Sequence, residues 1–143
     1  MIVIKRPETA EELNLYYELR YRILRKPWQQ PRGSEKDELE NVSVHVMAMD
    51  GGRVVGVGRL HGNPNEESQV RFMAVDPEYE GKGIGTLILK ELEKEARKRH
   101  SKCIVMDARE SAVDFYKKMG YRVVGPTHTL FGEIPHFRMK KDL

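Results

Sequence analysis

A glycine-rich turn is the segment of this sequence whose residue types point most directly to a chemical task. Residues 80–85 read Glu-Gly-Lys-Gly-Ile-Gly and separate a predicted strand over 69–75 from a predicted helix over 86–99. Glycines leave backbone amides uncovered and a helix N-terminus carries a partial positive charge, so the turn suits a phosphate or pyrophosphate group. The alternative, for this segment alone, is a strand-to-helix turn that binds no ligand.

The turn differs from two common nucleotide-binding motifs. It is not a Walker A loop, because Lys82 precedes the last two glycines and no Gly-Lys-Ser/Thr ends the turn. It is not a GxGxxG motif either, because Thr86 and Ile88 occupy the third-glycine positions of the two possible registers. Nucleotide hydrolysis and Rossmann-type dinucleotide binding therefore lose support.

Thiol and metal chemistry have little basis in this sequence. Cys103 is the only cysteine and precedes Ile104 and Val105, so we expect a buried, inert thiol. The five histidines lack the close pairing that is typical of metal ligands on one element, so no metal site is predicted.

Hydrophobic periodicity and turn residues predict alternating strands and helices. The expected strands cover 1–4, 42–49, 53–61, 69–75, 103–106, 121–124 and 136–140, and the expected helices cover 9–25, 86–99 and 111–119. Residues 26–41 are interpreted as a loop or lid containing a short helix, and residues 125–135 as a second loop. This order indicates a mixed α/β domain built on one strongly bent sheet.

Strand alternation also predicts which side chains share a face. On the strand over 53–61 we expect Arg59 and His61 to lie on one face with Val55 and Val57. The same rule places Arg71 on one face with its neighbours two residues away, Gln69 and Met73.

Length and composition exclude several protein classes. A chain of 143 residues is the size of one domain, 1–143, and its 39% hydrophobic residues are typical of a globular protein. No apolar run approaches the roughly 18 residues of a membrane span, and the first residues are too short an apolar stretch for a signal peptide, so we expect a cytoplasmic protein. The net charge of +3 is too small to favour nucleic-acid binding.

Two segments together resemble the acetyl-CoA-binding core of the GNAT acetyltransferases. They are residues 69–93, which contain the glycine turn, and residues 108–121. In that family a [Gln/Arg]-x-x-Gly-x-[Gly/Ala] loop binds the CoA pyrophosphate through backbone amides. Gly83 and Gly85 occupy the glycine positions, and Glu80 stands where Gln or Arg is usual.

The resemblance implies a fold and a binding slot for acetyl-CoA, the expected cosubstrate. The expected fold is a bent mixed sheet of about six or seven strands flanked by about four helices. The strand at 73–75 splays from the strand at 103–106, and the gap admits the pantetheine arm. The implied CoA-binding residues are Met73, Ala74, Val75, Gly81, Lys82, Gly83, Ile84, Gly85, Thr86, Arg109, Phe115 and Tyr116.

The resemblance also suggests catalytic roles. Tyr116 lies near the thioester sulfur in the family arrangement, and a tyrosine pKa of about 10 keeps its proton available as a general acid at neutral pH. The amide of Val75 is a candidate for oxyanion stabilisation. His61 is the first candidate for the general base, with His136, His45, Glu35 and Glu40 as alternatives.

We expect the acceptor pocket between the loop at 26–41 and the strand face that carries Arg59, His61 and Arg71. Its predicted residues are Glu35, Arg59, His61, Arg71 and His136. Because buried arginines need a partner, Arg59 and Arg71 bind either an acceptor carboxylate or an internal partner such as Glu35 or Glu40.

These patterns predict an N-acetyltransferase that transfers an acetyl group from acetyl-CoA to a primary amine of a small molecule or peptide by direct attack. The alternative is a catalytically silent CoA-binding sensor or interaction module. No metal, nucleic acid or membrane partner is expected, and the chain is expected to be a monomer or a homodimer.

Overall fold

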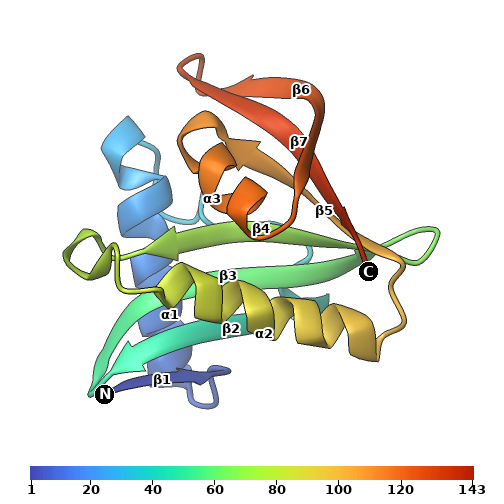
Figure 1. Cartoon of the computed structure of the whole chain (residues 1–143). Helices are drawn as coiled ribbons and strands as arrows, with labels where there is room; N and C mark the ends of the chain where they lie inside the picture. The colour runs from blue at the N-terminus through green and yellow to red at the C-terminus, as the bar shows by residue number, and fades with distance from the viewer.

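The protein folds around a single seven-stranded mixed sheet (Figure 1). The computed structural model describes residues 1–143, and the strand order is β1-β2-β3-β4-β5-β7-β6. The strands are β1 (Ile2–Lys5), β2 (Val44–Asp50), β3 (Arg53–Asn63), β4 (Glu67–Val75), β5 (Cys103–Arg109), β6 (Arg122–Leu130) and β7 (Ile134–Asp142). The predicted α/β class and the strand count are confirmed.

Three α-helices accompany the sheet, one fewer than the predicted count of about four. They are α1 (Ala10–Leu24), α2 (Ile84–Lys98) and α3 (Val113–Lys118). The remaining helical segments are short 3-10 turns at Lys26–Trp28, Glu40–Val42, Pro77–Tyr79 and Glu110–Ala112. None of the helices is both long enough and apolar enough to cross a membrane.

Helices α1 and α2 cover opposite faces of the sheet (Figure 1). Thr9 caps α1 as predicted, since its hydroxyl accepts a hydrogen bond from the Glu12 amide at 3.1 Å. Tyr16 and Leu19 of α1 pack in one core cluster, and Ile88 and Leu92 of α2 pack in the other.

The close packing of α2 against β3 requires glycine at two positions of β3. A Cβ atom at Gly58 would lie 2.8 Å from Ile88 Cγ2 and 2.6 Å from Met73 Sδ, and one at Gly56 would lie 2.7 Å from Ile84 Cγ2. Larger residues at these two positions would push the helix from the sheet.

Irregularities in β3 and β4 overturn two predicted face assignments. The pairing register of β3 shifts beside Val55, which packs on the α2 side, whereas Val57 packs on the α1 side. Phe72 has a φ of 58° where the register of β3 with β4 shifts. Beyond it Met73 packs with the α2-side core, while Arg71 pairs with Asp37 on the α1 side. A bulge inserts one residue, so strict alternation fails across it.

Strands β4 and β5 separate as the family resemblance implied. Their parallel pairing covers only Glu67–Gln69 against Cys103–Val105. Residues 71–75 of β4 therefore have no strand partner on the β5 side, and this gap provides the splayed slot.

The predicted loop over 125–135 is wrong, because most of it forms the β6–β7 hairpin. Residues up to Leu130 in β6 pair with β7, whose first residue is Ile134. Gly125 and Pro126 are typical of turns, but β6 is an edge strand with two register shifts, where proline is tolerated.

Candidate active site

Two clefts open beside the separated strands and meet at Tyr116. The glycine-turn cleft, of about 500 Å³, lies between the end of β4, the turn at 80–85 and α3. The hairpin cleft, of about 300 Å³, lies between β4, β5, the end of α1 and the β6–β7 hairpin. Met73, Ala112 and Tyr116 line both clefts, so the two spaces are adjacent at these three side chains.

The glycine turn presents uncovered amides to its cleft. Gly81 and Gly83 have φ values of 76° and 79°, and no atom lies within 4 Å of a Cβ built on either residue. Gly83 is the N-cap of α2 and provides no side-chain hydrogen bond to the first helical turn. The first amides of α2 are therefore free to bind an anion, and the turn fits the pyrophosphate of CoA.

The main chain of β4 also faces the gap. The Asp76 amide donates to the Val55 carbonyl oxygen at 2.8 Å, toward β3. Successive strand amides point to opposite sides, so the Val75 amide points away from β3 and toward the separated β5. This orientation suits both a pantetheine amide and the oxygen of a thioester.

Helix α3 holds Tyr116 at the junction of the clefts. The ring of Tyr116 packs edge-on against Phe115, with ring centroids 5.1 Å apart. Phe115 in turn lies against the first turn of α2, where a Cβ at Gly85 would approach its Cζ to 3.3 Å. Burial raises the pKa of Tyr116, so its hydroxyl is protonated at neutral pH.

The hairpin cleft contains a histidine suited to accept a proton. His136 Nδ1 lies 2.9 Å from the Ile134 carbonyl oxygen, which accepts only if Nδ1 carries the proton, and Nε2 then keeps its lone pair. Burial lowers the pKa of His136, and the nearby His128 lowers it further. The two imidazole rings stack with centroids 4.5 Å apart. His136 is therefore neutral at pH 7.

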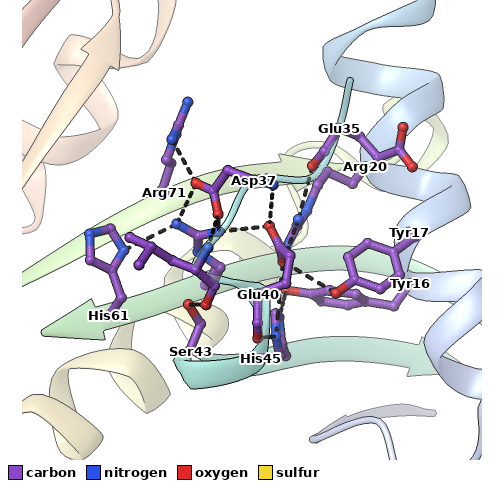
Figure 2. Close-up of polar contacts among 12 residues, drawn as sticks. Tyr16, Tyr17, Arg20, Glu35, Asp37, Glu40, Ser43, His45, His61 and Arg71 are labelled. Atoms are coloured by element: carbon purple, nitrogen blue, oxygen red, sulfur yellow. Dashed lines mark hydrogen bonds and ion pairs between the residues drawn. The ribbon is translucent and has the colours of Figure 1, made fainter. Parts of the chain in front are cut away.

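The strand face that was predicted to bind the acceptor is filled by an ion network (Figure 2). Arg59 is fully buried and donates to Asp37 at 2.6 and 3.0 Å and to Glu40 at 2.7 Å. Asp37 also accepts from Arg71 at 2.8 Å, and Glu40 accepts from Arg20 at 2.9 Å. We call these five residues the ion network.

The ion network corrects the prediction of an acceptor pocket at this face. Arg59 has an internal partner in Glu40, as one alternative proposed, and in Asp37, which the sequence did not single out. Glu35 is not a partner of these arginines through its carboxylate, which accepts from the Gly33 amide at 2.7 Å. The loop at 26–41 thus covers the strand face that carries Arg59, and it does not form one wall of an acceptor pocket there.

His61 lies at the edge of the ion network and lines neither cleft. Its Nδ1 is 3.2 Å from Arg59 Nη2, which donates to it, and burial lowers its pKa. The geometry gives no support to the predicted role of His61 as general base, whereas the alternative His136 lies in the hairpin cleft.

Most of the predicted residues line one of the two clefts. Arg71 and His136 are the predicted acceptor residues that line the hairpin cleft. Arg109 lines the hairpin cleft instead of the glycine-turn cleft, and Lys82 lies outside the lining with its Nζ 5.0 Å from the ring centre of Tyr79. The predicted CoA-binding residues that line the glycine-turn cleft are Met73, Ala74, Val75, Gly81, Gly83, Ile84, Gly85, Thr86, Phe115 and Tyr116.

Sequence reasoning missed Arg25, Asp107 and His128 of the hairpin cleft. No local pattern marks them, because Arg25 ends a helix and His128 falls in a segment that was interpreted as a loop. Their proximity depends on how the β6–β7 hairpin folds back over the sheet.

Comparison with known proteins identifies the family of this chain. A model of the acetyltransferase (GNAT) domain matches residues 23–143. The uncharacterized N-acetyltransferase YjcF of Bacillus subtilis strain 168 is 36% identical over 135 residues, which cover 94% of this chain and 96% of YjcF.

Solved structures show the same fold. A GNAT-family acetyltransferase from Staphylococcus aureus Mu50 matches with a TM-score of 0.83 and 18% identity over 100% of this chain and 99% of that one. An aminoglycoside 6'-N-acetyltransferase complexed with coenzyme A matches with a TM-score of 0.82 and 18% identity, covering 98% and 96% of the two chains. This chain therefore belongs to the GNAT family and is an acetyl-CoA-dependent N-acetyltransferase.

Proposed function

We propose that the protein acetylates a primary amine of a small molecule or peptide that enters through the hairpin cleft, with acetyl-CoA bound in the glycine-turn cleft. The observation that carries this proposal is the junction of the two clefts at Tyr116. A donor and an acceptor that approach from opposite sides would meet beside one buried, protonated hydroxyl group.

The donor would be held mainly by backbone groups. The amides of residues 81–86 would bind the pyrophosphate, and the main chain of Met73 and Val75 would bind the pantetheine arm along the splayed edge of β4. The open space at Gly81 and Gly83 supports this assignment, because a side chain at either residue would cover the amides.

The proposed reaction is a direct attack of the amine on the thioester. The amine nitrogen forms a bond to the acetyl carbon, the carbon–sulfur bond breaks, and the thiolate takes a proton from Tyr116. The Val75 amide would stabilise the negative charge that develops on the carbonyl oxygen. His136 Nε2 would accept the proton that the amine loses, a role that fits its lone pair and its place in the hairpin cleft.

The role of Tyr116 is tested with Tyr116→Phe in single-turnover reactions with acetyl-CoA and an amine found in a thiol-release screen. The variant keeps the aromatic ring, so CoA binding should persist, whereas the acetyl-transfer step should slow by about 100-fold, a loss typical of a positioned proton donor. Single-turnover rates isolate this step from product release.

Tyr121→Phe is the matched control. The Tyr121 ring lies 5.9 Å from that of Tyr116, but its hydroxyl donates to Glu93 and it lines neither cleft. Its acetyl-transfer rate should equal that of the parent protein. An equally fast transfer step in Tyr116→Phe would rule out the acid role.

A further inference from the structure

Two arginines in the hairpin cleft lack a carboxylate partner. Arg25 is buried, and it donates from Nε to the Ser34 carbonyl oxygen and from Nη1 to the Leu24 carbonyl oxygen, both at 2.9 Å. Arg109 donates from Nη2 to the same Leu24 oxygen at 3.1 Å. The two guanidinium groups therefore lie next to each other with neutral partners only.

The other arginines near this cleft are neutralised. Arg71 pairs with Asp37 at 2.8 Å, and Arg138 pairs with Asp107 at 2.8 Å. Burial, with the charge of the neighbouring Arg109, lowers the pKa of Arg25 to about 10. Burial also lowers the pKa of Arg109. Two adjacent cations in a partly dry cleft are unfavourable unless an anion joins them.

Aromatic rings fix the direction of both guanidinium groups. Arg109 lies over the Trp28 ring at 4.7 Å from its centre, and Arg25 lies over the Phe131 ring at 5.4 Å. Trp28 follows α1 and Phe131 lies in the β6–β7 turn. The end of α1, the end of β5 and this turn lie on one side of the molecule (Figure 1). The pair is therefore preorganised from three separate elements.

We propose that the amine acceptor carries a carboxylate that binds between Arg25 and Arg109. This inference rests on the proposed function and narrows its substrate class to amino acids in the broad sense, with an amine at one end and a carboxylate at the other. A monoanion fits better than a phosphate dianion, because the C-terminal carbonyls of α1 and the nearby Glu35 already offset part of the positive charge.

The experiment compares acids with their amides, since the two differ in charge but little in shape. Probes are ω-amino acids from 3-aminopropanoate to 6-aminohexanoate, the matching ω-amino amides, and 3-aminopropylphosphonate. Thiol release from acetyl-CoA gives kcat/KM for each probe. Calorimetry with N-acetyl-5-aminopentanoate and its amide gives binding to the protein without any reaction.

We expect the parent protein to prefer the acid over the amide by about 10-fold or more in both measurements, as a charged hydrogen bond implies. Arg109→Gln should abolish this preference, because kcat/KM and affinity for the acids should fall to the level measured with the matching amides in the same variant. Arg122→Gln is the control, because Arg122 is an exposed arginine outside both clefts, and it should keep the preference.

Several outcomes would overturn the inference. The parent protein could bind the acid and the amide equally, or Arg109→Gln could keep the preference for the acid. Either result would show that the two arginines have only a structural role at the end of α1. If the parent protein prefers the phosphonate, the acceptor carries a phosphate group and the proposed carboxylate is wrong. If no amine is acetylated while the acid product still binds selectively, the proposed function fails and the anion site stands.

Discussion

At the scale of single residues, the surroundings of two histidines decide which of them can accept a proton from a substrate. Burial lowers the pKa of both His61 and His136. His61, however, accepts a hydrogen bond from Arg59 at the edge of the ion network, whereas His136 donates from Nδ1 to a backbone carbonyl oxygen and lines a cleft. His136 thus has the free lone pair that a general base requires.

The pH dependence of kcat/KM tests the base. Because the pKa of His136 is lowered from 6.5, its neutral form persists above that pH, and the contribution of His136 to kcat/KM should be lost only at lower pH as the imidazole becomes protonated. His136→Gln should reduce kcat/KM by about 100-fold and remove this acidic limb. The ionisation of the amine is identical in parent and variant, so the difference between their profiles belongs to the protein.

His61→Gln serves as the comparison for His136→Gln. It should leave the acidic limb in place, since His61 reaches neither cleft. If instead the limb disappears in His61→Gln and persists in His136→Gln, the base is His61 and the assignment of His136 fails.

At the scale of elements, the sequence predicts what depends on local signals. Helix α1 follows its Thr9 cap, and α2 follows the glycine turn, because capping and hydrophobic spacing act within a few residues. The bulge at Phe72 and the register shifts of β6 depend on strand pairing instead. Local sequence patterns therefore could not predict which face of the sheet carries Met73 and Arg71, or how far the β6–β7 hairpin extends.

The same distinction explains which parts of the active site were predictable. The glycine-turn cleft is built from residues 73–86 and 111–116, two continuous segments with a recognisable pattern. The hairpin cleft collects Arg25 from the end of α1, Asp107 from β5 and His136 from the β6–β7 hairpin, three segments that are distant in the sequence. Asp37 and Arg59 are 22 residues apart along the chain, and only the folded loop brings them together.

Gly83→Asp tests the glycine turn. The new carboxylate would stand among the amides that bind pyrophosphate, and CoA affinity should fall by about 100-fold, the upper range for loss of a charged hydrogen bond. At a CoA concentration of 100 times the parent Kd, CoA stabilises the parent by about 2.7 kcal/mol and such a variant by only about 0.4 kcal/mol. Thermal unfolding with and without CoA measures both values.

Gly33→Asp is the control for backbone strain. Gly33 also has a positive φ, 101°, with no atom within 4 Å of a built Cβ, but it lies in the loop at 26–41. Both variants should lose stability without ligand, and only Gly83→Asp should lose the gain from CoA. An undiminished gain in Gly83→Asp would remove the turn from CoA binding.

At the scale of the whole molecule, the ion network joins the loop at 26–41 to α1 and to the central strands. Burial alone would raise the pKa of Asp37, but hydrogen bonds from Arg59 and the Leu39 amide, with the charge of Arg71, hold it well below its usual range. Glu40 is shifted in the same direction, with burial opposed chiefly by Arg20. The charged form of both carboxylates therefore stabilises the fold.

Asp37→Asn should lower the free energy of unfolding by about 3 kcal/mol at pH 7, because it leaves the buried Arg59 with one carboxylate fewer. In the parent, the lowered pKa of Asp37 gives stability that is complete above about pH 4 and decreases by about 1.4 kcal/mol per unit below it. Asparagine does not titrate, so the difference in the free energy of unfolding between parent and variant should shrink as the pH falls.

Urea unfolding from pH 7 to pH 2.5 measures this difference. The control is Asp142→Asn, in the exposed pair with Arg122, which should change the free energy of unfolding little at any pH. A difference that stays constant with pH would show that Asp37 contributes through packing and not through its charge.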